Sequence, residues 1–129
     1  MDAETVQQVR ARANQRCEYC HFSERFSPLS FHVEHIIAKQ HRGSDELGNL
    51  ALACPNCNLH KGPNLTSIDP DSGLVTVLFN PRTQVWEHHF KLEGHRIVGI
   101  TPEGRTTAWL LQFNSHDRIQ WRVLIGGAG

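Results

Sequence analysis

The chain has 129 residues, and its 13 Lys and Arg side chains balance its 13 Asp and Glu side chains, so its formal net charge is zero. It has no apolar run near the roughly 20 residues of a membrane-spanning helix, which argues against a membrane protein. A neutral chain does not attract nucleic acid over its whole surface, so any contact with a polyanion has to be local. These properties predict one soluble domain over residues 1–129.

The beginning of the chain, MDAETVQQVRARANQR, is polar and charged, whereas a secretory leader needs an apolar stretch. We therefore expect a cytoplasmic protein whose four cysteines stay reduced. Disulfide bonds are then a poor expectation, and a bound metal is the better explanation for paired cysteines.

A short amphipathic helix is predicted near the N-terminus, over residues 3–14. Val6, Val9 and Ala13 recur there at helical spacing, with no Gly or Pro between them. Asn14 tolerates the left-handed conformation that ends many helices.

Two strands and a second helix are predicted next. Residues 29–37 and 50–53 are rich in apolar and β-branched side chains, and a long polar loop joins them. Pro55 suits the first turn of a short helix over residues 55–61, which Gly62-Pro63 ends.

The remaining residues, 63–125, are expected to form a scaffold extension. Three apolar runs separated by turn residues predict a three-stranded meander: residues 74–79, 85–90 and 96–100. Two helices follow, the first capped by Thr101, and the glycine-rich end at 126–129 is expected to be a flexible tail.

The four cysteines form two C-x-x-C pairs, Cys17 with Cys20 and Cys54 with Cys57. A two-residue spacer lets one tight turn aim two thiolates at one ion, and two such turns complete the tetrahedron that Zn²⁺ prefers. Four protein ligands leave no open coordination position, so the predicted Zn²⁺ is structural. Reduced core cysteines and a redox pair are the alternatives.

Further motif residues lie between and directly after these pairs. They are Glu34-His35, Asn49-Leu50, Asn58 immediately after the last cysteine, and Lys61. The run VEHIIAKQHRGSDELGNLALACPNCNLHKG, preceded by CEYC, resembles the HNH endonuclease family. The resemblance implies an α+β fold with a ββα-metal core over residues 17–62, clipped by the four-cysteine zinc site.

The resemblance also implies a role for each motif residue. His35 is the general base that takes a proton from the water attacking a phosphodiester. Glu34 and Asn58 hold a divalent cation, and Asn49 bonds to the backbone of the loop that fixes His35. A carboxylate with an amide favours Mg²⁺ or Mn²⁺. The expected products carry 5′-phosphate and 3′-hydroxyl ends.

His60 and Lys61 follow Asn58 on the same predicted helix. Helical spacing turns His60 away from Asn58, so we interpret both residues as supporting the site or contacting a phosphate. For His60, a metal ligand and an ordinary surface residue remain alternatives.

Four basic side chains are candidates for contacts with DNA phosphates: Arg12, Arg16, Lys39 and Arg42. Arg12 and Arg16 share a helical face if the first helix extends that far. Ordinary solvated charge is the alternative for all four.

The sequence after residue 63 resembles, more weakly, the C-terminal part of small stand-alone bacterial HNH proteins, in LFNPR at residues 78–82, Trp86 and His89-Phe90. It contains no helix-turn-helix or similar reading module, which predicts low sequence specificity. We predict a metal-dependent endonuclease acting on DNA, most simply duplex DNA. A zinc-stabilised nucleic-acid-binding module without cleavage activity and action on RNA remain alternatives. The sequence leaves the oligomeric state and the biological role open, whether phage defence, restriction, recombination or a mobile element.

Overall fold

The computed structural model describes residues 1–126 and divides the chain into two compact units, Met1–Asn64 and a second unit that begins at Leu65. Within the described residues the fold is mixed α+β, with four α-helices and small antiparallel hairpins, which confirms the predicted class. No helix among residues 1–126 has the length and apolar character needed to cross a membrane. The single domain over residues 1–129 stays a prediction.

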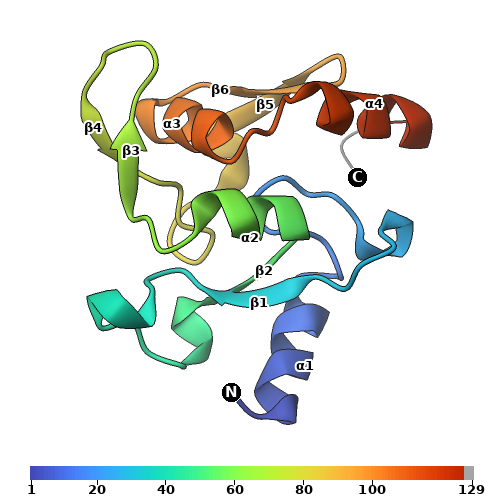
Figure 1. The fold of residues 1–129 in the computed structure, drawn as a ribbon, viewed down its shortest axis with the longest axis vertical. Helices are drawn as coiled ribbons and strands as arrows, with labels where there is room; N and C mark the ends of the chain where they lie inside the picture. The colour runs from blue at the N-terminus through green and yellow to red at the C-terminus, as the bar shows by residue number, and fades with distance from the viewer. Residues whose placement is uncertain (127–129) are drawn as a thin grey trace. The chain divides into compact units, whose positions relative to one another are not determined.

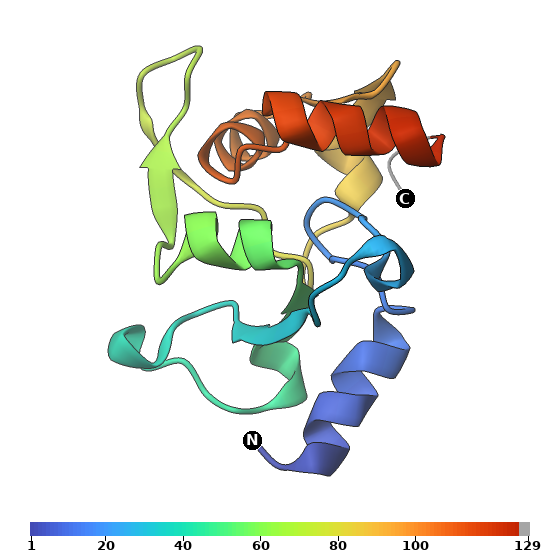
Figure 2. The same cartoon turned by 45° about the vertical axis from the view of Figure 1, so that its right-hand side comes forward.

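The first unit is built on one hairpin with a helix on each side. Strand β1 (His32–His35) pairs antiparallel with β2 (Leu50–Ala53). Helix α1 (Ala3–Arg12) lies on one side of the hairpin and α2 (Pro55–Lys61) on the other (Figures 1 and 2). Because β2 is covered from both sides, all four of its residues are buried, and its sequence is a continuous apolar run.

The first helix and the first strand are shorter than predicted. Helix α1 ends at Arg12, and Asn14 takes the predicted left-handed conformation with a φ of 57°. The strand predicted over residues 29–37 is reduced to β1 because the flanking backbone bonds to side chains. The Phe31 N–H donates to the Glu24 carboxylate at 2.6 Å, and the Ile37 N–H donates to Asn49 Oδ1 at 2.8 Å.

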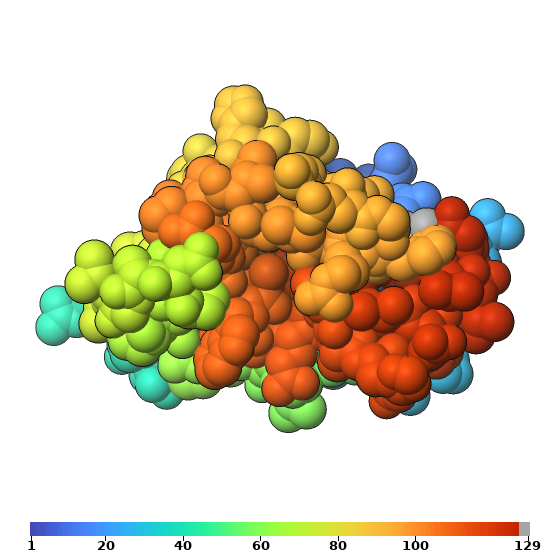
Figure 3. Space-filling model, turned by 90° about the horizontal axis from the view of Figure 1, so that it is seen from above, coloured from blue at the N-terminus to red at the C-terminus, as the bar shows by residue number. Residues whose placement is uncertain are grey.

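The second unit has two hairpins and two helices: β3 (Thr66–Ile68), β4 (Val75–Val77), β5 (Phe90–Glu93), β6 (Arg96–Gly99), α3 (Pro102–Leu110) and α4 (His116–Ile125). Strand β3 pairs with β4, and β5 pairs with β6. Seen from above, α3 lies between the β3–β4 hairpin and α4 (Figure 3). Residues 127–129 of the predicted tail lie outside the described residues.

The predicted three-stranded meander is replaced by these two separate hairpins. Strand β4 ends early because the Phe79 N–H donates to the Thr107 hydroxyl of α3 at 2.8 Å. A 3-10 turn over Trp86–His88 takes the place of the middle strand. There the Trp86 ring packs against Phe90 with 5.0 Å between ring centroids. Helix contacts and aromatic packing therefore override the strand pattern.

Candidate functional site

The two cysteine pairs meet in one buried cluster. The four sulfur atoms lie within 4.8 Å of one another, and Cys20 Sγ is 3.7 Å from Cys54 Sγ. A tetrahedral zinc site with Zn–S bonds of about 2.3 Å has S···S edges of about 3.8 Å. The number, chemistry and spacing of the donors therefore fit one structural Zn²⁺.

Local backbone geometry prepares each pair for a shared ion. The Cys20 N–H donates to Cys17 Sγ at 3.5 Å, and the Cys57 N–H donates to Cys54 Sγ at 3.4 Å. Cys54 caps α2, with Pro55 at the first helical position. Burial raises the pKa of the Cys17 and Cys57 thiols well above the ordinary value, and a bound cation would favour their ionised form.

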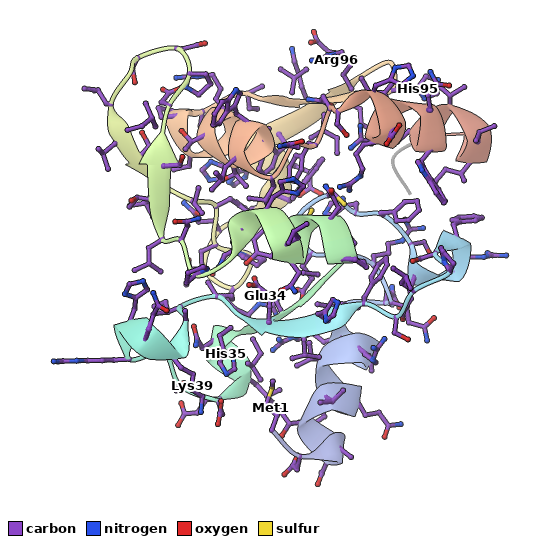
Figure 4. The ribbon with its side chains drawn as sticks, viewed as in Figure 1. Met1, Glu34, His35, Lys39, His95 and Arg96 are labelled. Atoms are coloured by element: carbon purple, nitrogen blue, oxygen red, sulfur yellow. The ribbon has the colours of Figure 1, made fainter. Side chains whose placement is uncertain are left out.

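Glu34 is a buried carboxylate that is only 7% exposed. It lies on the α2 side of β1 (Figure 4). It accepts a hydrogen bond from the Tyr19 hydroxyl, and Lys61 Nζ lies 3.3 Å from its Oε2. Burial raises the pKa of Glu34, and the Lys61 ammonium opposes that rise. Lys61 is itself 2% exposed and donates to the Ile36 carbonyl at 2.9 Å, so it supports Glu34 from inside the unit.

His35 lies on the other side of β1, next to the loop that follows it (Figure 4). Its Nε2 is 2.6 Å from Asp45 Oδ1, and the other oxygen of Asp45 accepts from Lys39 Nζ at 2.8 Å. Hydrogen bonds from Lys39 and His35 lower the pKa of Asp45 to about 2. The sequence analysis missed Asp45. The signal available was its place in the loop between His35 and Asn49, which contains only one other carboxylate, Glu46.

Asn49 ties both ends of this loop together. Its Oδ1 accepts from the Ile37 N–H at 2.8 Å, and its Nδ2 donates to the carbonyls of Ile37 and Ser44, each at 2.9 Å. Gly43 is required where the loop closes, because a Cβ atom there would lie 1.6 Å from the Ile37 carbonyl oxygen. Asn49 therefore holds the backbone next to Asp45.

One open pocket joins the principal motif residues. Glu34, His35 and Asn58 line it together, and Lys39 lies at the same pocket. Within residues 1–126 the half-buried Asn58 side chain makes no hydrogen bond. His60 lies outside the lining, and its Nδ1 is 2.8 Å from the Asn56 carbonyl oxygen.

The four predicted phosphate-binding side chains differ in their surroundings. Arg12 donates to the carbonyls of Leu47 and Leu50 at 3.0 and 2.7 Å, which ties α1 to the hairpin unit. Helix α1 ends at Arg12, so it does not extend far enough for Arg12 and Arg16 to share a helical face. Lys39 and Arg42 are exposed on the loop, and Arg42 has a left-handed φ of 69°.

Comparison with known proteins relates one segment of the chain to a protein family. Residues 17–64 match the family model of the HNH endonucleases, so this segment is an HNH endonuclease domain, as the sequence motifs predicted. Over 117 residues the chain is 27% identical to the Septu protein PtuB of Bacillus thuringiensis. The match covers 88% of this chain but only 43% of that relative. No solved structure matches the chain.

Proposed function

We propose that the HNH domain hydrolyses phosphodiester bonds of DNA in a reaction that requires Mg²⁺ or Mn²⁺. The observation that supports this most strongly is the shared pocket lined by Glu34, His35 and Asn58. These three lining residues carry a carboxylate, an imidazole and an amide. The products carry 5′-phosphate and 3′-hydroxyl ends.

His35 acts as the general base in this proposal. The ionised oxygens of Asp45 can only accept hydrogen bonds, so Nε2 bears a proton, and in the neutral imidazole Nδ1 then keeps a lone pair. That lone pair takes the proton of the attacking water. Proton transfer of this kind contributes about 10²–10⁴-fold to a rate.

Glu34 and Asn58 hold the divalent cation. The Glu34 carboxylate has lone pairs beyond those that Tyr19 and Lys61 use, and the Asn58 amide makes no other hydrogen bond in the described part of the chain. Carboxylate and amide oxygens are the ligands that Mg²⁺ and Mn²⁺ prefer, so the donor set fits. A cation bound there supplies electrostatic stabilisation of the phosphate and of the leaving oxygen.

Basic side chains near the pocket contact the DNA backbone. Lys39 and Arg42 lie on the exposed loop, and Arg12 and Arg16 add charge at the N-terminal side of the same unit. Because the whole chain is neutral, this local charge has to supply the electrostatic attraction, and binding should weaken as salt rises. Backbone contacts carry no sequence information, which supports low specificity for duplex DNA. Four reduced thiols also favour a reducing compartment such as the cytoplasm.

Incubation of the zinc-loaded protein with supercoiled plasmid tests the proposal. We expect nicked and then linear DNA when Mg²⁺ or Mn²⁺ is added, and intact plasmid in the same buffer without a divalent cation. Leaving out the divalent cation is a better control than adding a chelator, because a chelator also removes structural Zn²⁺. A DNA ligase, which joins 5′-phosphate to 3′-hydroxyl ends, should reseal the nicks.

Plasmid that stays intact with both cations would contradict the proposal. If the same protein retards the DNA on a gel, the domain is a zinc-stabilised binding module instead. If the protein cuts single-stranded RNA but not plasmid, its substrate is RNA rather than DNA.

A further inference from the structure

We infer that Asp45 is the positioning residue for His35, holding the imidazole with its proton on Nε2 and its Nδ1 lone pair available at the pocket. The catalytic consequence of this contact rests on the proposed function. The contact itself does not, so the two can be tested apart.

The chemistry of the contact fixes the ring. Asp45 Oδ1 lies 2.6 Å from His35 Nε2, within ordinary hydrogen-bond distance. An ionised carboxylate only accepts hydrogen bonds, and the Asp45 pKa of about 2 keeps it ionised at neutral pH. The ring nitrogen facing Asp45 must therefore be the donor. The same logic governs the serine-protease triad, where a carboxylate selects the histidine tautomer.

The Asp45 carboxylate makes one further contact, with Lys39. Its second oxygen accepts from Lys39 Nζ at 2.8 Å, which fixes the plane of the carboxylate. The side chains of His35 and Asp45 are 22% and 45% exposed, so the hydrogen bond between them adds little stability by itself. The geometry has to come from the backbone that carries Asp45.

That backbone is held firmly on the side of Ser44, the residue before Asp45. The Ser44 carbonyl accepts from Asn49 Nδ2, and the same amide is bonded twice to Ile37, two residues after His35. Gly43 permits the close approach that this closure requires. Asn49 thus links the His35 strand to the loop that carries Asp45.

The first test observes the ring directly and needs no activity. In protein with ¹⁵N-labelled histidine, we expect a protected Nε2–H signal at neutral pH, assigned to His35 by its absence from His35→Ala. Asp45→Ala should lose this signal through exchange with water. Glu46→Ala, which removes the adjacent exposed carboxylate, should keep it. A signal that survives in Asp45→Ala would overturn the inference.

The second test measures steady-state cleavage. Asp45→Ala should lower kcat by about 10²-fold or more, because the general base loses its orientation. KM should change little, because the contacts with DNA remain. Asp45→Glu should recover part of the loss, and Glu46→Ala should cut like the wild type. An unchanged kcat in Asp45→Ala, or equal losses in both alanine variants, would contradict the role.

The two tests separate the possible failures. If the wild type does not cut DNA but the Nε2–H signal depends on Asp45, the proposed function fails and the positioning contact stands. If the wild type cuts and the signal does not depend on Asp45, the inference alone is wrong.

Discussion

Replacement of His35 by alanine should slow plasmid cleavage by about 10²–10⁴-fold, the range expected for loss of a general base. His35 lines the pocket with Glu34 and Asn58, and its Nε2 is hydrogen-bonded to Asp45, which is the arrangement that the proposed general base requires. The fold should persist, because the hydrogen-bonded pair of His35 and Asp45 is partly exposed, and such pairs add little to stability. Cleavage rates and melting temperatures of the two proteins check this expectation.

His32→Ala provides the matched control, because His32 is an exposed histidine on the same strand and outside the pocket lining. It should cut like the wild type. If His35→Ala cuts as fast as the wild type at an equal melting temperature, the base has been assigned to the wrong residue. A general loss of folding in His35→Ala would instead mean that the ring is structural.

Replacement of Cys54 by serine should release the structural Zn²⁺ and lower stability strongly. Loss of a metal belongs to the mutations that cost more than about 4 kcal/mol. For a unit of this size, that corresponds to a fall in melting temperature of about 15 °C or more. Cys54 also caps α2, which carries Asn58, so the fall should be accompanied by loss of cleavage.

Metal analysis and thermal melting of the wild type and the variant measure this effect. Treating the wild type with a chelator should lower its melting temperature to a similar degree, and added Zn²⁺ should restore the wild type but not Cys54→Ser. Two results would contradict a structural zinc site. One is a purified wild type that contains no Zn²⁺, and the other is a Cys54→Ser variant with the same melting temperature as the wild type.

Much of the first unit could be predicted because the determining signals are local. The C-x-x-C spacing sets the cysteine geometry, Pro55 and Gly62 delimit α2, and Asn14 marks the end of α1. Such signals depend on a few neighbouring residues and survive any tertiary arrangement.

The features that could not be predicted depend on contacts between distant residues. Asp45 reaches His35 only through a loop shape that Asn49 and Gly43 create together. The early end of β4 depends on a hydroxyl of α3, that of Thr107. No periodicity in the sequence reports such contacts.

The unexpected surroundings of Glu34 have the same origin. Its place before His35 predicted a metal ligand, whereas its contacts with Tyr19 and Lys61 come from residues far away in the chain. Burial of a lysine beside the carboxylate neutralises part of its charge. Metal binding at Glu34 and Asn58 therefore remains the point on which the proposed chemistry depends most.

The most direct test of this point measures Mn²⁺ binding to the His35→Ala protein by electron paramagnetic resonance. The DNA duplex is present during the measurement and stays uncut. We predict one bound Mn²⁺ per chain. Affinity should fall about tenfold or more when Asn58→Ala is added. It should not change when Asn56→Ala, at a position on the same helix but outside the pocket lining, is added instead. Equal Mn²⁺ affinity in all three proteins would contradict a metal site built on Asn58.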